Sequence, residues 1–140
     1  MPELPEVESI ARRLQYAIKG RKILNGKVMW HKTVHGLSVN AFLDSVQDAT
    51  IQQVGRRGKY IIITLAPALN WLIHLRMSGK FTVVDLHAND TPPHKHTRAS
   101  FELDQGLRLD YVDMRKFGRF YLVPDPADIT GHLGIEPLDY

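Results

Sequence analysis

The chain has 140 residues, of which 44% are hydrophobic and 24% charged, a balance typical of one folded domain and not of a disordered segment. It contains no cysteine, which excludes disulfides and cysteine-ligated zinc within these residues, and it shows no apolar run long enough to cross a membrane. The formal net charge of +3 at pH 7 and the pI of about 9.3 are compatible with an anionic partner without requiring one.

The first twenty residues predict an amphipathic helix. Pro5 suits a first helical turn, and Lys19-Gly20 provides a C-terminal cation followed by a glycine cap. Between them, apolar residues recur at helical spacing: Val7, Ile10, Ala11, Leu14 and Ile18. A helix that packs along this stripe would hold Pro2 and Glu3 at its exposed tip.

Pro2 carries a chemical possibility that depends on removal of Met1. Once Met1 is cleaved, Pro2 is an N-terminal secondary amine, and a terminal amine has an unperturbed pKa of about 7.7–8.0. Such an amine can attack a sugar C1′ or an aldehyde and form a cationic iminium, while the carboxylates of Glu3 and Glu6 shuttle protons. The alternative is a common Met-Pro start whose acids only cap a helix, and for Met1-Pro2 alone that alternative is favoured.

Beyond the helix the chain predicts mostly strands. Residues 22–29 predict an early strand, and residues 41–46 predict a short helix. The later predicted strands are residues 60–65, 71–75, 81–84, 100–103, 107–111 and 120–123. Asp104-Gln105-Gly106 is a hairpin signal, and residues 86–98 form the longest predicted loop. Successive alternating segments predict an α+β fold that is mainly β, a two-sheet β-sandwich flanked by the N-terminal helix.

Two basic groups precede or begin strands. Arg56-Arg57-Gly58-Lys59 places a glycine among three cations, and backbone amides with a lysine at such a turn suit a phosphate. Taken alone, this group is better interpreted as a solvated turn. The second group is His94-Lys95-His96-Thr97-Arg98. His94 and His96, expected on one face of a strand, are an alternative metal pair, which the lack of a further carboxylate or cysteine nearby disfavours.

A third basic group, Arg115-Lys116-Phe117-Gly118-Arg119, interleaves cations with an aromatic side chain. Phe117 follows two cations and Met77 lies in a turn between predicted strands, so both could point outward. Most Met and Phe side chains are buried, however, and spacing alone favours a core position for Phe117.

The first eight residues, Met1-Pro2-Glu3-Leu4-Pro5-Glu6-Val7-Glu8, resemble the signature start of the formamidopyrimidine-DNA glycosylase/endonuclease VIII family of base-excision repair enzymes. Leu4 is similar to the formamidopyrimidine branch, since the other branch usually has glycine at this position. The resemblance continues in family order through Arg56-Arg57-Gly58-Lys59-Tyr60, His74-Leu75-Arg76-Met77-Ser78-Gly79, Asp113-Met114-Arg115-Lys116-Phe117-Gly118 and Leu133-Gly134-Ile135-Glu136-Pro137-Leu138. Each segment is weakly to moderately specific, whereas the ordered set is highly specific and covers the chain from end to end.

This resemblance implies a bifunctional DNA glycosylase/AP lyase that removes oxidised purines through an iminium intermediate and β,δ-elimination. Pro2 matches the nucleophile that attacks C1′, and Glu3 matches the general acid/base. Glu6 is expected to position the N-terminus. Lys59 matches a lysine that contacts the phosphate and the target nucleotide near the proline.

The resemblance also implies a set of DNA-binding residues. An enzyme that acts on a base must extrude it and fill the space that remains, for which apolar wedges and an arginine are suited. Met77, Arg115 and Phe117 match the family's void-filling set, which outweighs the preference of spacing for a buried Phe117. Lys95-His96 resembles a phosphate contact. The expected partner is double-stranded DNA with oxidised or abasic sites.

The resemblance implies that residues 1–140 correspond to the family's N-terminal catalytic domain, without its helix–two-turn–helix and zinc-finger domains. We therefore expect no metal or organic cofactor in this chain, a monomer, no membrane association and a cytoplasmic location in the bacterial cytosol or nucleoid. Ile135 replaces the proline usual in its segment.

Two alternatives stay open at this level. One is a catalytically impaired single-domain module that binds damaged DNA, against which the intact Pro2, Glu3 and Lys59 argue. The other is a generic β-sandwich interaction protein, which would leave the ordered motifs to coincidence.

Overall fold

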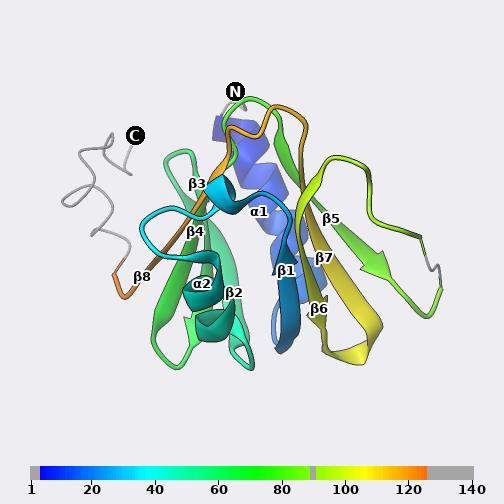
Figure 1. Ribbon diagram of the computed structural model, residues 1–140. Coiled ribbons are helices and arrows are strands. Elements are labelled where there is room, and N and C mark those ends of the chain that lie inside the picture. The colour runs from blue at the N-terminus through cyan, green and yellow to red at the C-terminus, as the bar shows by residue number, and fades with distance from the viewer. Residues whose placement is uncertain (1–3, 89–90, 126–140) are drawn as a thin grey trace.

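The computed structural model describes residues 4–88 and 91–125 as two packed antiparallel sheets with two helices (Figure 1). The elements in chain order are α1 (Leu4–Ile18), β1 (Ile23–Val28), η1 (His31–Thr33), α2 (Val39–Val46), β2 (Thr50–Arg57), β3 (Tyr60–Ala66), β4 (Leu69–His74), β5 (Gly79–Asp85), β6 (Thr97–Leu103), η2 (Asp104–Gly106), β7 (Leu107–Asp113) and β8 (Arg119–Val123). The strand orders are β1-β6-β7-β5 and β2-β3-β4-β8. The predicted two-sheet, mainly β fold is confirmed.

A cluster of aromatic side chains joins both sheets to α2. Trp71 of β4 is fully buried, and its ring centroid lies 4.8 Å from that of Phe101 in β6 and 5.1 Å from that of Phe120 in β8. Phe42 of α2 reaches the same indole at 5.6 Å. Because these rings come from four elements, the predicted helix over residues 41–46 and the inward faces of the strands form one continuous core.

Helix α1 follows the predicted stripe and closes one side of the sandwich. Val7, Ala11, Leu14 and Ile18 are buried, and Ile10 is partly buried against the same core. The helix lies along β2, where the side-chain oxygen of Gln15 accepts a hydrogen bond from the backbone N–H of Val54 at 2.5 Å. The glycine cap is also present, since Gly20 adopts a φ of +84°.

Strand β2 does not follow from the alternation pattern, and the sequence analysis missed it. Ile51 and Val54 both face the core although they are three residues apart. The register against β3 shifts between Ile51 and Gln53, so a bulge breaks the two-residue period. Residues 56–59 are therefore the end and turn of a β2–β3 hairpin. Strand β6 likewise begins at Thr97, inside the predicted loop.

The strand registers bring four connections to one end of the sandwich, which we call the loop end: residues 58–59, 75–78, 94–96 and 114–118. In one sheet, Arg57 pairs with Tyr60, Tyr60 with His74 and His74 with Arg119. In the other sheet, Gly79 pairs with Asp113 and Thr97 with Val112. Figure 1 shows these connections at the top of the molecule, where α1 also begins.

Candidate nucleic-acid interface

The N-terminal turns of α1 are tied to the β2–β3 hairpin at the loop end. Glu8 accepts hydrogen bonds from Nε of Arg12 at 3.0 Å and from Nε of Arg56 at 2.9 Å. The bond from Arg12, together with Arg56, holds the pKa of the Glu8 carboxyl below its usual range. Glu6 is exposed in the first turn of the helix. The predicted Pro2 and Glu3 lie outside the described residues, and α1 begins two residues after Pro2.

Lys59 lies half-buried in the turn that Arg56 helps to shape. The Nη1 group of Arg56 donates to the carbonyl of Gly58 at 3.2 Å, and Gly58 adopts a φ of +60°, which favours glycine. The Glu8–Arg56 ion pair therefore holds the turn that contains Lys59 beside the N-terminal turns of α1.

The sequence analysis assigned no role to His74, although a histidine inside the apolar run 71–75 indicates a buried polar side chain. It is 9% exposed, its ring stands 4.9 Å from that of Tyr60, and its Nδ1 accepts the backbone N–H of Arg76 at 3.1 Å. Because Nδ1 is an acceptor, a neutral His74 ring carries its proton on Nε2.

Met77 and Phe117 are surface residues. Their exposed fractions are 55% and 47%, and Arg115 at the loop end is also exposed. The core position that spacing alone favours for Phe117 is therefore wrong. Its position in a connection between sheets, and not within a strand, removes it from the alternation that would bury it.

Lys95 and His96 lie in a turn before β6, and His94 precedes that turn. The expectation that His94 and His96 share a strand face is wrong, because the backbone N–H of His96 bonds to Nδ1 of His94 at 2.9 Å and turns the chain. Within residues 4–88 and 91–125, no group of three or more His, Asp or Glu side chains is placed to hold a metal ion.

His96 contributes a neutral ring to this turn. Partial loss of solvent lowers its pKa below the usual range, and the nearby cations Arg98 and Lys95 act in the same direction. Nδ1 of His96 lies 3.3 Å from Nη2 of Arg98. Near neutral pH the ring can therefore accept a hydrogen bond from that guanidinium, while Lys95 stays exposed.

Trp30 is a further feature of the loop end that sequence analysis missed. The Nζ atom of Lys116 lies 4.5 Å from the centroid of the Trp30 ring, and that of Lys32 lies 5.9 Å away. Both distances suit cation–π contacts. Met29 and Met114 beside these residues in sequence are 47% and 59% exposed. The contacts hold two ammonium groups against one indole ring.

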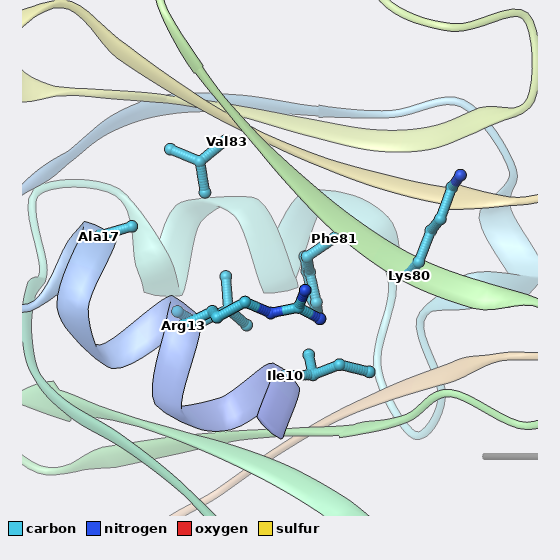
Figure 2. A pocket seen from close by; sticks show the side chains of 7 residues that line it. Ile10, Arg13, Ala17, Lys80, Phe81 and Val83 are labelled. Atoms are coloured by element: carbon cyan, nitrogen blue, oxygen red, sulfur yellow. The ribbon is translucent and has the colours of Figure 1, made fainter. Parts of the chain in front are cut away.

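A groove of about 420 Å³ between α1 and β5 lies apart from these residues (Figure 2). Its lining is Ile10, Arg13, Leu14, Ala17, Lys80, Phe81 and Val83. In Figure 2, Arg13 extends from α1 between Ile10 and Phe81. No predicted site residue and no acid or histidine lines the groove, so it offers no proton-transfer group.

The connection that carries Arg115 and Phe117 depends on Gly118. A Cβ built at Gly118 would overlap the hydroxyl of Tyr111 and stand 2.9 Å from Oδ2 of Asp113. We expect Gly118→Ala to lower the free energy of unfolding by about 1–3 kcal/mol, the usual cost of overpacking. Chemical denaturation measures the change.

The matched control for this prediction is Gly55→Ala in β2, where an added Cβ meets no atom within 4 Å. We expect this change to be neutral or stabilising by up to about 1 kcal/mol, since alanine restricts the unfolded chain. Equal stability of the two variants would contradict the close packing of Gly118 against Tyr111.

The loop end thus combines exposed cations, exposed apolar side chains and a tethered helix start on the β-sandwich, which makes it a candidate nucleic-acid interface. None of the helices in the described ranges is long and apolar enough to span a membrane.

The family model for the formamidopyrimidine-DNA glycosylase N-terminal domain matches residues 1–120. The chain therefore belongs to the formamidopyrimidine-DNA glycosylase family.

Individual relatives agree with this assignment. The chain is 44% identical over 139 residues to the formamidopyrimidine-DNA glycosylase of Protochlamydia amoebophila, covering 99% of this chain and 49% of the relative. It is 41% identical over 143 residues to that of Pelotomaculum thermopropionicum, covering 99% and 51%. The chain thus spans about half the length of the curated relatives it matches.

Solved structures show the same fold. Lactococcus lactis Fpg in a complex with DNA containing an abasic site superposes with a TM-score of 0.84 at 32% identity, over 95% of this chain and 48% of that chain. The same TM-score and identity hold for that protein bound to DNA containing Fapy-dG.

Proposed function

We propose that this chain is the N-terminal catalytic domain of a bifunctional DNA glycosylase/AP lyase that removes oxidised purines from double-stranded DNA in the bacterial cytosol or nucleoid. The observation that carries the proposal is the convergence at the loop end of the start of α1, the Lys59 turn and the exposed Met77, Arg115 and Phe117. The similar Lactococcus lactis protein, solved with abasic-site and Fapy-dG DNA, supports this substrate class.

The proposed reaction begins with the secondary amine of Pro2. Its nitrogen forms a bond to C1′ of the flipped nucleotide, the bond from C1′ to the base breaks, and the departing base takes up a proton while the Pro2 nitrogen loses its own. Glu3 supplies a proton to the sugar ring oxygen as the ring opens, which leaves an iminium at C1′. The iminium acidifies C2′, so β-elimination and then δ-elimination release the two phosphates. Glu6 positions the terminal amine.

The remaining predicted residues bind DNA in this proposal. Lys59, held beside the start of α1, binds the phosphate of the target nucleotide, and Lys95 and His96 bind a phosphate further along. Met77 and Phe117 enter the opened base stack, and Arg115 bonds the base left unpaired. The chemistry uses only the amine, carboxylates and cations of this chain, so we propose that it takes no metal or organic cofactor here.

Borohydride trapping on abasic DNA tests the proposed function. Reduction of an iminium would leave a stable covalent protein–DNA adduct, visible as a shifted band in a denaturing gel. We expect an adduct with abasic duplex and none with undamaged duplex. Preferential binding of abasic duplex without any adduct would instead support the damage-binding module. If the chain shows no binding and no adduct, that result would contradict both functions for this chain.

Salt dependence provides a separate prediction about DNA binding. We expect duplex affinity in the non-specific range of about 10⁻⁴–10⁻⁶ M at physiological salt, falling steeply as salt rises, because neutralised phosphates release counterions. Lys95→Ala should reduce the slope of log affinity against log salt by about 1, the loss of one phosphate contact. Fluorescence anisotropy at several salt concentrations measures the slope.

Lys19→Ala is the matched control for the salt experiment. Lys19 is also exposed, but it follows α1 at the end of the sandwich opposite the loop end, where Gly20 bonds to Ile51 of β2. The same charge is lost, so equal slopes for the two variants would show that Lys95 contributes only to the net charge.

A further inference from the structure

The loops that carry Met77 and Arg115 converge on one buried carboxylate, that of Asp113, which is 1% exposed at the end of β7. Its Oδ1 accepts hydrogen bonds from Oγ of Ser78 at 2.5 Å and from the backbone N–H of Lys116 at 3.2 Å. The hydroxyl of Ser78 in turn accepts the backbone N–H of Arg115 at 3.1 Å. A continuous chain of hydrogen bonds thus links residues 75–78 to residues 114–118.

The second oxygen of the same carboxylate fixes the far side of the Phe117 connection. Oδ2 of Asp113 accepts the backbone N–H of Gly118 at 2.7 Å and the hydroxyl of Tyr111 at 3.1 Å. Burial and the neighbouring carboxylate raise the pKa of Tyr111 well above its usual range, so its hydroxyl remains a donor. A Cβ built at Gly79 or at Gly118 would overlap that hydroxyl, so both positions require glycine for this packing.

The backbone of Asp113 adds the third loop. Its N–H donates to the carbonyl of His96 at 3.0 Å, and its carbonyl accepts Nε of Arg98 at 2.8 Å. Three of the four connections of the loop end therefore have a direct bond to Asp113. Lys116 adopts a φ of +62°, an unfavourable value for a non-glycine residue that these bonds stabilise.

We propose that Asp113 is a positioning residue that sets Met77, Arg115 and Phe117 at fixed mutual positions before DNA arrives, so that they enter an opened base stack as one unit. The inference rests on the proposed function of those three residues. Its physical reason is preorganisation: two loops already ordered in the free protein do not lose that conformational freedom on binding. Each hydrogen bond to a charged carboxylate also resists opening more strongly than a neutral one.

Asp110 provides a matched control within the same strand. It is 2% exposed and accepts Oγ of Ser100 at 2.6 Å and Nε of Arg108 at 3.0 Å. Asp110→Asn therefore alters a buried carboxylate with a serine partner, as Asp113→Asn does. The two differ in that Asp110 bonds to Ser100 of β6 and Arg108 of β7, and not to the loop end.

The first measurement needs no DNA. Amide hydrogen exchange in the full chain should show Lys116 and Gly118 protected, and Asp113→Asn should raise their exchange rates by about tenfold or more, the order expected for loss of bonds to a charged acceptor. Ser78→Ala, a milder change, should do the same at Arg115. Asp110→Asn should leave all three amides unchanged. Unchanged protection in Asp113→Asn, or equal loss in Asp110→Asn, would overturn the proposal; if Asp113→Asn does not fold, Ser78→Ala decides.

The second measurement compares affinities for a duplex with a tetrahydrofuran abasic site and for the undamaged duplex. We expect Asp113→Asn to reduce the ratio of abasic-duplex affinity to undamaged-duplex affinity to the value that Phe117→Ala shows. The undamaged-duplex affinity should stay within about twofold of the wild-type value, because Lys59 and Lys95 are intact. A ratio that stays at the wild-type value would overturn the positioning role. If the wild type itself shows no preference for the abasic duplex, the proposed function of the wedge residues fails, and the exchange experiment still decides whether Asp113 holds the loops together.

Discussion

Retention of Met1 is expected to abolish the borohydride-trapped adduct with abasic DNA. An attached methionine converts the nitrogen of Pro2 from a secondary amine into an amide, whose lone pair is delocalised and cannot attack C1′. Pro2→Gly, with a primary terminal amine, should weaken or abolish trapping. Because a terminal amine has a pKa of about 7.7–8.0, trapping by the processed chain should increase as pH rises through that range.

Two controls separate chemistry from binding in this experiment. The Met1-retaining form should keep the salt-dependent duplex affinity of the processed chain, since Lys59 and Lys95 are unchanged. Mass spectrometry establishes which form is present. Equal trapping by the Met1-retaining form would assign the nucleophile to another amine, with Lys59 the first to replace. A loss of trapping accompanied by loss of all DNA binding would show that the N-terminus contributes to affinity instead.

Phe117→Ala and Phe120→Ala are expected to differ by several kcal/mol although the residues are three positions apart. Phe120 is fully buried, and its ring lies 4.9 Å from that of Tyr111 and 5.1 Å from that of Trp71. Its truncation should reduce the free energy of unfolding by about 3–5 kcal/mol, through lost burial and an unfilled cavity. Phe117→Ala should cost less than about 1 kcal/mol, because an exposed ring loses few contacts.

Denaturant titrations of the free protein measure both changes. Met77→Ala should behave like Phe117→Ala, since both side chains are about half exposed. For the effect on DNA binding the order should reverse. Met77→Ala and Phe117→Ala should weaken binding more than Phe120→Ala, because the two exposed residues are the ones proposed to fill the opened base stack. A drop of several kcal/mol for Phe117→Ala would mark that ring as part of the core and remove it from the interface.

Local patterns predicted the elements that obey a regular period. Helix α1 was predictable because Val7, Ala11, Leu14 and Ile18 repeat every three to four residues. The β6–β7 hairpin was predictable because Gly106, with a φ of +77°, marks its turn. Strand β2 was not, since its bulge moves a buried side chain out of the alternating pattern.

The sequence by itself determined the two-sheet architecture, the chemical types available at the candidate site and the family. These follow from composition, period and ordered motifs, which are properties of neighbouring residues. Exposure of Phe117 was predicted from the family resemblance against the local preference, and the fold confirms it.

Only the tertiary structure decided which of these residues lie together and what holds them. Ser78 and Asp113 are 35 positions apart, and Glu8 and Arg56 are 48 apart, yet each pair is in hydrogen-bond contact. Lys116 meets Trp30 across a still longer separation. No periodic pattern encodes such pairs, because each depends on strand order, register and the way two connections cross between the sheets. Burial of the Asp113 carboxylate is possible only where that crossing supplies its donors.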